Sequence, residues 1–359
     1  MSPYDAPAPL ARPAAFAGAF ARPLSDGPKD GPMDGQGRAV RYLRLSVTDR
    51  CDLRCLYCMP QRMQFLPRAE VLTLEELDRV ATAFIGLGVR KLRLTGGEPL
   101  IRKGVLDLIA TLGRHLRSGA LDELTRTTNA THLAAAAPAL FDAGVRRVNV
   151  SLDSADPDTY RRLTLGGDLS ATLDGVRAAQ AIGIAVKLNA VALARDNRAE
   201  LPSLVRFAHD LGCDLTLIEA MPMGEIEDRA SQFVSLADVR RDLSAVWTLT
   251  HITNATGGPA RWLRVEETGG RLGLITPLSD HFRDDCHRVR VTCTGTLHTC
   301  LGQDDATDLR ASLREHPGDD GPMITAIRSG LATKPRGHDF TLDRGGAPAV
   351  ARHMSTTGG

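Results

Sequence analysis

Two hydrophobic patterns follow each other repeatedly along residues 40–220. Short stretches in which apolar and polar residues alternate, such as 91–95 (KLRLT) and 146–152 (RRVNVSL), have the two-residue period of strands. Between them apolar residues recur every three or four positions, as at 105–116, which predicts amphipathic helices. Thr73 and Glu76 match a capping box that opens another such helix. The pattern therefore predicts six strand–helix repeats around a parallel sheet.

Six repeats are fewer than the eight of a complete α/β barrel, so the predicted fold is a partial (β/α)6 TIM-like barrel. After about residue 232 the segments become shorter and predict a C-terminal antiparallel addition. Residues 1–38 are rich in Ala, Pro and Gly and predict a disordered extension. The expected organisation is an N-terminal extension (1–38), the barrel (39–232) and a C-terminal substrate region (233–359).

Composition and charge narrow the class of protein. The chain has 359 residues and a net charge of +1, which gives no overall field for nucleic acid or an acidic membrane surface. No apolar run is long enough to span a bilayer, and no secretory signal pattern is present. Seven cysteines are too few for a disulfide scaffold in a chain of this length. We therefore expect metal or redox chemistry in a reducing compartment, the cytoplasm.

The candidate chemistry begins in the stretch CDLRCLYC, directly after the first predicted strand. Its three thiolates can bind three irons of a [4Fe–4S] cluster and leave the fourth iron open to a chelating ligand. A zinc site is the alternative, but structural zinc usually has four protein ligands in C-x2-C pairs, and no fourth cysteine is near. Cys51, Cys55 and Cys58 are therefore the predicted cluster ligands.

Two further features point to the inside and the same end of the predicted barrel. LTGGEPL follows the second strand, and its glycines allow a ligand to approach the backbone. Arg44, Arg93 and Lys187 alternate with apolar residues in three different strands, so they can point into the barrel. A single such residue is more often a surface charge. Three in separate strands favour an anion pocket, because arginine's fork suits phosphate oxygens.

These motifs resemble those of the radical S-adenosylmethionine (SAM) superfamily, C-x3-C-x-Y-C followed by TGGEP. The resemblance implies that the open iron chelates SAM and that an electron from the cluster cleaves it to a 5′-deoxyadenosyl radical. A longer ordered set resembles the GTP 3′,8-cyclase family of molybdenum-cofactor biosynthesis and covers about residue 40 to the end. This set includes RLSVTDRCDLRCLYCMP, KLRLTGGEPLIR, TTNA, VNVSLDS, IEAMPMG, CHRVRVT and a terminal diglycine.

The narrower resemblance implies roles for individual residues. The positions that contact SAM in the family correspond to Tyr57, Gly97, Glu98, Ser151 and Met221, with Glu98 approaching the amino group of SAM. The positions that hold GTP correspond to Arg44, Arg93, Thr127, Lys187, Arg288 and Arg290. The expected catalytic residues on the substrate side are Arg288, Arg290, Gly358 and Gly359. Ala130 replaces the family's glycine in TNG, which disfavours the turn there.

The family also carries a second [4Fe–4S] cluster on three C-terminal cysteines, and this sequence departs from that pattern. Cys286 and Cys300 match two of the positions, but Arg283 stands at the first. A hairpin centred near Cys293 would set Cys286 opposite Cys300 and leave Cys293 roughly 23 Å away along the strand, too far for one cluster. Either an aspartate at 284–285 completes a weaker site, or no second cluster forms and Arg283 adds one more cation. The second interpretation is favoured.

Three functions compete. The leading interpretation is a lyase that converts GTP to (8S)-3′,8-cyclo-7,8-dihydroguanosine 5′-triphosphate. A diverged radical SAM enzyme for another nucleotide or a peptide is the alternative that Arg283 favours. A non-catalytic nucleotide-binding paralogue is the third, and the intact cysteine loop opposes it. The resemblance implies as partners GTP, an electron donor such as flavodoxin or ferredoxin, and a downstream cyclic pyranopterin monophosphate synthase, and it leaves a homodimer open.

Overall fold

The structure is a computed structural model. It describes residues 31–60, 62–224, 229–253, 258–279, 286–338, 340 and 348–358. Most of the predicted N-terminal extension therefore lies outside the described residues, and so do Arg283, the aspartates at 284–285 and Gly359. None of the helices in the described part of the chain is both long and apolar enough to cross a membrane.

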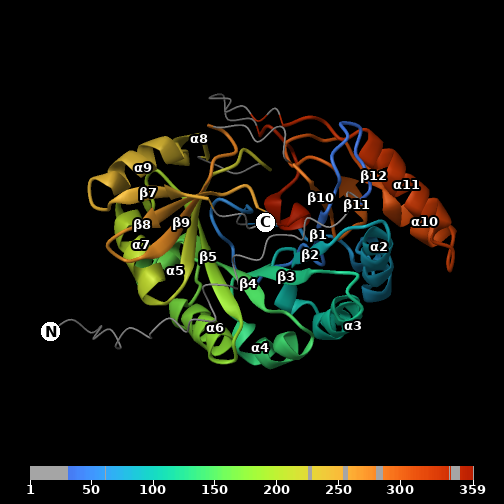
Figure 1. The fold of residues 1–359 in the computed structure, drawn as a ribbon, viewed down its shortest axis with the longest axis horizontal. Coiled ribbons are helices and arrows are strands. Elements are labelled where there is room, and N and C mark those ends of the chain that lie inside the picture. Colours follow the sequence, from blue (N-terminus) through green and yellow to red (C-terminus); the bar gives the residue numbers. More distant parts are fainter. Residues whose placement is uncertain are drawn as a thin grey trace.

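One twelve-stranded sheet organises the described residues, in the order β12-β11-β10-β1-β2-β3-β4-β5-β6-β9-β8-β7. Its six central strands are parallel neighbours and curve into an open barrel (Figure 1). They are β1 (Tyr42–Ser46), β2 (Lys91–Thr95), β3 (Glu123–Thr128), β4 (Arg147–Ser151), β5 (Ala185–Ala192) and β6 (Asp214–Glu219). The prediction of a partial (β/α)6 barrel is confirmed.

Helices cover the convex side of this barrel (Figure 1). They are α2 (Leu74–Gly86), α3 (Val105–Arg117), α4 (Leu133–Asp142), α5 (Pro157–Thr164), α6 (Leu169–Ala181) and α7 (Leu201–Asp210). The predicted capping box of α2 is present, because the Thr73 side chain accepts from the Glu76 N–H and the Glu76 carboxylate accepts from the Thr73 N–H. The pattern did not predict α5, which is short and mostly polar and begins at an Asp156 cap with Pro157 in its first turn.

The C-terminal region extends both edges of the barrel sheet. On one side β9 (Gly270–Ile275) is parallel to β6, and β8 (Arg261–Val265) and β7 (Leu249–Ile252) follow antiparallel. On the other side β10 (Arg288–Val291) is parallel to β1, and β11 (Thr296–His298) and β12 (Thr307–Asp308) follow antiparallel. The helices of this region are α8 (Arg229–Gln232), α9 (Leu236–Ser244), α10 (Leu309–Glu315), α11 (Gly321–Ala332) and α12 (Met354–Thr357). The predicted antiparallel addition is confirmed, with the refinement that two of its strands join the sheet in parallel.

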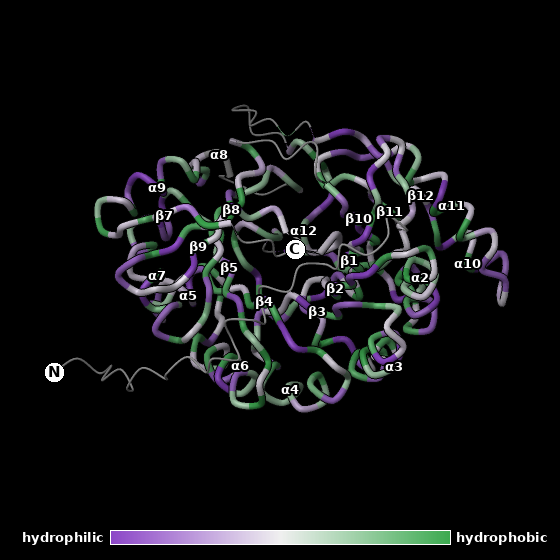
Figure 2. Tube along the Cα trace, in the orientation of Figure 1, coloured by the Kyte–Doolittle hydropathy of each residue, from purple (hydrophilic) through white to green (hydrophobic). Residues whose placement is uncertain are grey.

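The two faces of the central strands differ in chemistry. Leu43, Leu45, Leu92 and Leu94 belong to the main hydrophobic core with the helices. The residues between them in sequence face the concave side, and many of these are charged. Figure 2 shows hydrophilic and hydrophobic residues alternating along these strands. The barrel interior is therefore a polar chamber rather than a packed apolar core, and it can hold a charged ligand.

Candidate active site

A cavity of about 1230 Å³ lies inside the open barrel. Both candidate cysteine groups and the predicted cationic residues line it, so residues far apart in sequence meet in one space. The predicted site residues among its lining are Cys51, Cys55, Cys58, Tyr57, Gly97, Ser151, Met221, Arg44, Arg93, Thr127, Lys187, Arg288, Arg290, Cys286 and Cys300. Glu98 and Gly358 do not line it directly.

The three-cysteine loop leaves the carboxyl end of β1 and is pinned to the end of α5. The N–H groups of Arg54 and Leu56 donate to the carbonyls of Thr164 and Leu163, both at 3.0 Å. The Cys58 N–H donates to the Cys55 carbonyl at 2.9 Å, which folds the loop back on itself. All three cysteines line the same cavity and supply the three thiols that one cluster needs, although in the described residues these side chains are not drawn together around a metal position.

Electrostatics around these thiols also fit a metal cluster. Burial raises the pKa of Cys51 and of Cys58 to about 12 and that of Cys55 well above its usual range. Nearby carboxylates raise all three pKa values further, and neighbouring thiols also raise those of Cys51 and Cys55. Thiolates at this place therefore need strong positive charge to form, which bound iron supplies. The donor set fits the three-thiolate cluster expected from the sequence.

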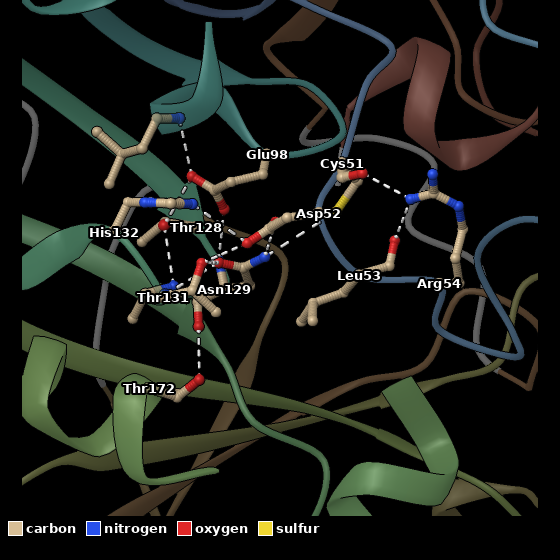
Figure 3. A network of polar contacts seen from close by, with 12 residues as sticks. Cys51, Asp52, Leu53, Arg54, Glu98, Thr128, Asn129, Thr131, His132 and Thr172 are labelled. Atoms are coloured by element: carbon tan, nitrogen blue, oxygen red, sulfur yellow. Dashed lines mark hydrogen bonds and ion pairs between the residues drawn. The ribbon is translucent and has the colours of Figure 1, made fainter. Parts of the chain in front are cut away.

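A polar network ties the loop to the ends of β2 and β3 (Figure 3). The Asn129 side chain donates to Asp52 Oδ1 at 2.7 Å and lies 4.0 Å from Cys51 Sγ. Its backbone N–H donates to Glu98 Oε2 at 2.7 Å, and Thr131 Oγ1 donates to Asp52 Oδ2 at 2.6 Å. Because every connection is a hydrogen bond to a charged group, the loop is held firmly to the sheet.

Glu98 is the centre of this network and is fully buried. Its carboxylate accepts from the Leu100 N–H and Thr128 Oγ1 at 2.9 Å each, and Arg126 approaches it at 3.9 Å. Burial raises the pKa of Glu98, and the Arg126 charge and these donors oppose that rise. The geometry gives Glu98 a structural position behind Gly97, so the expected contact with the SAM amino group stays a prediction.

Gly97 is the part of this motif that faces the cavity. A Cβ at Gly97 would overlap the backbone carbonyls of Asp49 and Arg50, so a larger residue would push the cysteine loop away. Ala130, where the expected glycine is missing, has a φ of +66° and is fully buried. The turn therefore forms as in a glycine-containing sequence, with backbone strain at Ala130.

Tyr57 shows how the loop reaches the opposite strands. Its hydroxyl donates to Asp153 Oδ2 at 2.7 Å, and Asp153 Oδ1 accepts from the Val191 N–H at 2.8 Å. Burial raises the pKa of Asp153 to about 6, although both hydrogen bonds lower it. Asp153 was not among the predicted site residues. Its position two residues beyond Ser151, in the same predicted strand end, was the available signal.

The cationic wall of the cavity follows from strand register. Arg290, Arg44 and Arg93 lie side by side on β10, β1 and β2. Arg288, Tyr42 and Lys91 form the adjacent row, and Asn149 lies opposite Lys187 between β4 and β5. Sequence reasoning missed the cavity-lining residues Tyr42, Lys91, Arg147 and Asn149. Tyr42, Lys91 and Asn149 each lie two residues from a predicted site residue of the same strand, so the two-residue period could have found them; Arg147 has no such neighbour.

Comparison with known proteins identifies the family. The chain is 64% identical to the GTP 3′,8-cyclase of Caulobacter vibrioides over 90% of this chain and 93% of that protein. It is 59% identical to those of Rhodopseudomonas palustris and Rhizobium etli, again over 90% of this chain and 94% and 93% of theirs. The chain belongs to the GTP 3′,8-cyclase family. Residues 45–208 match the radical SAM superfamily and residues 213–340 match Molybdenum Cofactor Synthesis C.

Solved structures show the same fold at low identity. Streptococcus suis SuiB bound to S-adenosylmethionine aligns with a TM-score of 0.55 and 16% identity, over 88% of this chain and 75% of that one. SuiB bound to its precursor peptide aligns with a TM-score of 0.56. The fold of these structures therefore extends through most of this GTP 3′,8-cyclase family chain.

The C-terminal tail of this family member reaches the end of β2. Arg290 donates to the carbonyl of Gly358. Gly358 has a φ of +80°, and a Cβ there would overlap the Thr95 side chain. Gly358 thus contacts the cationic wall through Arg290, while its expected catalytic role stays a prediction and Gly359 lies outside the described residues.

The second cysteine pair lies on the β10–β11 side of the cavity. The predicted hairpin is present, with Arg290 opposite His298 and its centre at residue 294, but its register does not set Cys286 opposite Cys300, and both cysteines lie outside the paired strands. Lys334 Nζ lies 3.6 Å from Cys286 Sγ. Burial disfavours the Cys286 thiolate, but Arg288 and Lys334 lower the pKa of Cys286 to about 7. Cys293 is fully buried and does not line the cavity.

These thiols do not make a three-thiolate set within the described residues. Cys286 and Cys300 both line the cavity, but Arg283 and its neighbouring aspartates lie outside the described part of the chain. Across all the described residues, the first cysteine loop included, no group of three or more His, Cys, Asp or Glu side chains is arranged to hold a metal ion, so this finding does not separate the two cysteine groups. The favoured interpretation, that no second cluster forms, stays a prediction.

Proposed function

We propose that the chain catalyses the cyclisation of GTP to (8S)-3′,8-cyclo-7,8-dihydroguanosine 5′-triphosphate, as the names of its relatives imply. One observation carries the proposal: the three-cysteine loop and the cationic wall open into the same cavity. A site for a reactive cofactor and a site for a polyanion are thereby adjacent. Both are needed if a nucleotide is to react while its phosphates are held.

Cys51, Cys55 and Cys58 would hold a [4Fe–4S] cluster whose open iron binds SAM. Together these cofactors supply reductive radical chemistry. The chain's own residues bind and orient the substrate. Arg44, Arg93 and the other cations of the wall neutralise the triphosphate and fix the ribose relative to the cysteine loop.

The same wall restrains movement of the nucleotide during the reaction. Several cations from different strands bind the phosphates, so the nucleotide cannot rotate freely as a whole, and the ribose and the purine keep their orientation. Arg290 couples this grip to the tail through the Gly358 carbonyl. The tail would then close the substrate side and keep water away from the reacting atoms.

The partners and the compartment complete the proposal. The thiol chemistry and the absence of a disulfide framework support a reducing compartment, the cytoplasm. A one-electron donor such as flavodoxin or ferredoxin would reduce the cluster. The cyclised nucleotide would pass to cyclic pyranopterin monophosphate synthase.

An anaerobic assay tests the proposal. Reconstituted enzyme is incubated with dithionite, SAM and GTP, and the nucleotides are analysed by mass spectrometry. We expect a 3′,8-cyclised GTP together with 5′-deoxyadenosine, and neither product from Cys55→Ala. Formation of 5′-deoxyadenosine from the wild type with GTP left intact would contradict the proposal and favour a radical SAM enzyme with another substrate. Absence of both products would favour a nucleotide-binding paralogue.

A further inference from the structure

Tyr42 is a buried phenol that has no role in the proposed cyclisation of GTP. It is the first residue of β1, lines the cavity and is only 1% exposed. Its hydroxyl finds no hydrogen-bond partner among the described residues. A buried hydroxyl without a partner carries a free-energy penalty, so such groups in native proteins call for an explanation. A ligand in the cavity can supply the missing partner.

Positive charge surrounds this phenol on several sides. In the sheet Tyr42 lies between Arg288 of β10 and Lys91 of β2. The Lys91 Nζ is 4.9 Å from the centre of the Tyr42 ring. The guanidinium carbons of Arg44 and Arg93 are 5.6 Å and 5.5 Å from it. Cations at this distance are attracted to the ring, so one aromatic side chain helps to position three of them.

Few carboxylates balance these charges. Glu123 of β3 is nearby, but it is already bound to Lys91 at 2.7 Å and to Arg147. Burial disfavours the Tyr42 phenolate, yet the charges of Arg93, Arg44 and Lys91 outweigh burial and lower the pKa of Tyr42 to about 7. The charged groups that face Tyr42 are Arg288 and Arg290 from β10, Arg44 from β1, Lys91 and Arg93 from β2, and Glu123 from β3.

The place of Tyr42 along the strand indicates which part of a nucleotide it meets. The cysteine loop follows the carboxyl end of β1, whereas Tyr42 is at the amino end, roughly 13 Å lower at about 3.3 Å per residue. A ribose that reacts near the loop directs its phosphates down the cavity. The terminal phosphate then comes nearest to Tyr42.

We propose that Tyr42 is a substrate-positioning residue whose ring holds the surrounding cations and whose hydroxyl donates a hydrogen bond to the terminal phosphate of GTP. The inference rests on the proposed function, because it assumes a nucleoside triphosphate in this cavity. Without nucleotide, the Tyr42 phenolate is one of the negative groups that balance the surrounding cations. A bound triphosphate takes over that role, and the phenolate oxygen takes up a proton from solvent and donates it in a hydrogen bond to the phosphate. Above about pH 7, binding of GTP is therefore coupled to proton uptake.

The test is calorimetric binding of GTP and GDP to reconstituted enzyme under anaerobic conditions, at pH 8, in two buffers of different ionisation enthalpy. The wild type should take up about one proton with GTP. Tyr42→Phe, which keeps the ring, should bind GTP on the order of tenfold more weakly. GDP affinity should change by less than about threefold, because its last phosphate ends short of Tyr42. Proton uptake should disappear in this variant.

A matched control is Tyr160→Phe. Tyr160 is also buried, bonds to Thr172 at 2.8 Å and does not line the cavity. It should retain both GTP affinity and proton uptake. Unchanged GTP affinity in Tyr42→Phe, an equal loss for GTP and GDP, or uptake that persists without the hydroxyl would each overturn the proposal. Absence of uptake in the wild type would do so without any variant.

The two proposals fail in different ways. A wild type that binds GTP with proton uptake but does not cyclise it would overturn the proposed reaction and leave the role of Tyr42 standing. A wild type that cyclises GTP without proton uptake would overturn the role of Tyr42 and leave the proposed reaction standing. A wild type that does not bind GTP overturns both.

Discussion

Replacement of Gly358 by alanine should uncouple the tail from the active site without unfolding the protein. Gly358 has a φ of +80° and a ψ of 130°, which lies outside the left-handed helical region, so alanine is strained there by at least about 1–2 kcal/mol. The new Cβ would also overlap the Thr95 side chain at the end of β2. Thr95 is buried in a strand and cannot move aside, so the overlap adds roughly 1–3 kcal/mol.

Together these effects disfavour the docked tail by about 2–5 kcal/mol, and each 1.4 kcal/mol is about a factor of ten in an equilibrium. The tail is short and terminal, so it can leave its place while the barrel stays folded. We therefore expect Gly358→Ala to lower kcat/KM for GTP cyclisation at least about 30-fold, while the melting temperature changes little. Arg290 would lose its contact with the Gly358 carbonyl at the same time.

The assay compares initial rates of cyclised product in reconstituted wild type and variant. Gly119→Ala is the matched control, because Gly119 has a similar φ of +74° but no atom lies within 4 Å of the added Cβ. Gly119 lies just after α3, so the Gly119→Ala variant should lose stability without losing activity. A Gly358→Ala enzyme with activity within threefold of the wild type would refute the reasoning, because the docked tail would then be unnecessary.

Three further results are expected. Glu98→Ala should lower the free energy of unfolding by about 3–5 kcal/mol in denaturant titrations, because buried Arg126 loses its carboxylate partner; a loss below about 1 kcal/mol would contradict this. Glu123→Gln should lower the free energy of unfolding by roughly 3 kcal/mol at pH 7. Burial raises the pKa of Glu123, but the charges of Lys91 and Arg147 outweigh burial and lower that pKa to about 2. A carboxyl whose pKa is lowered on folding stabilises the protein above its unfolded pKa of about 4.5, and this stabilisation disappears as the pH falls towards 2. The melting-temperature difference from wild type should thus shrink as the pH falls from about 5 to about 3, and an unchanged difference over that range would speak against it. Cys293→Ala should keep the wild-type iron content, whereas Cys58→Ala should lose iron, both measured on anaerobically reconstituted protein; iron loss in the first would make Cys293 a ligand.

The strands of the barrel were predictable because each combines a two-residue hydrophobic period with clear boundaries in the sequence. The predicted 91–95 coincides with β2, and the helix predicted after Thr73 coincides with α2. Helix α5 was missed because it is short and exposes most of its polar residues. Helices α10 and α11 were missed because the later segments were taken together as an antiparallel addition.

The same physical reason separates the site residues that were predicted from those that were missed. Arg44 and Arg93 were found because a charge between two leucines in a strand implies a polar inner face. Tyr42 and Lys91 share that face, but a tyrosine or lysine at the start of a strand also fits a surface position. Their importance depends on register between strands, which places Tyr42 between Lys91 and Arg288, a residue of a strand far along the chain. No local pattern encodes that pairing.

The register of β10 also explains why the C-terminal region and the barrel act as one unit. β10 pairs in parallel with β1, so Arg288 and Arg290 enter the same rows as Tyr42 and Arg44. A slip by one residue would turn both arginines to the apolar side and bring the side chain of Val291 into the cavity. Val291 is fully buried in the core and does not line the cavity, so its exposure to the polar chamber would oppose the slip. The hydrophobic side of β10 therefore fixes the substrate-facing side, and the cationic wall depends on packing that never touches the nucleotide.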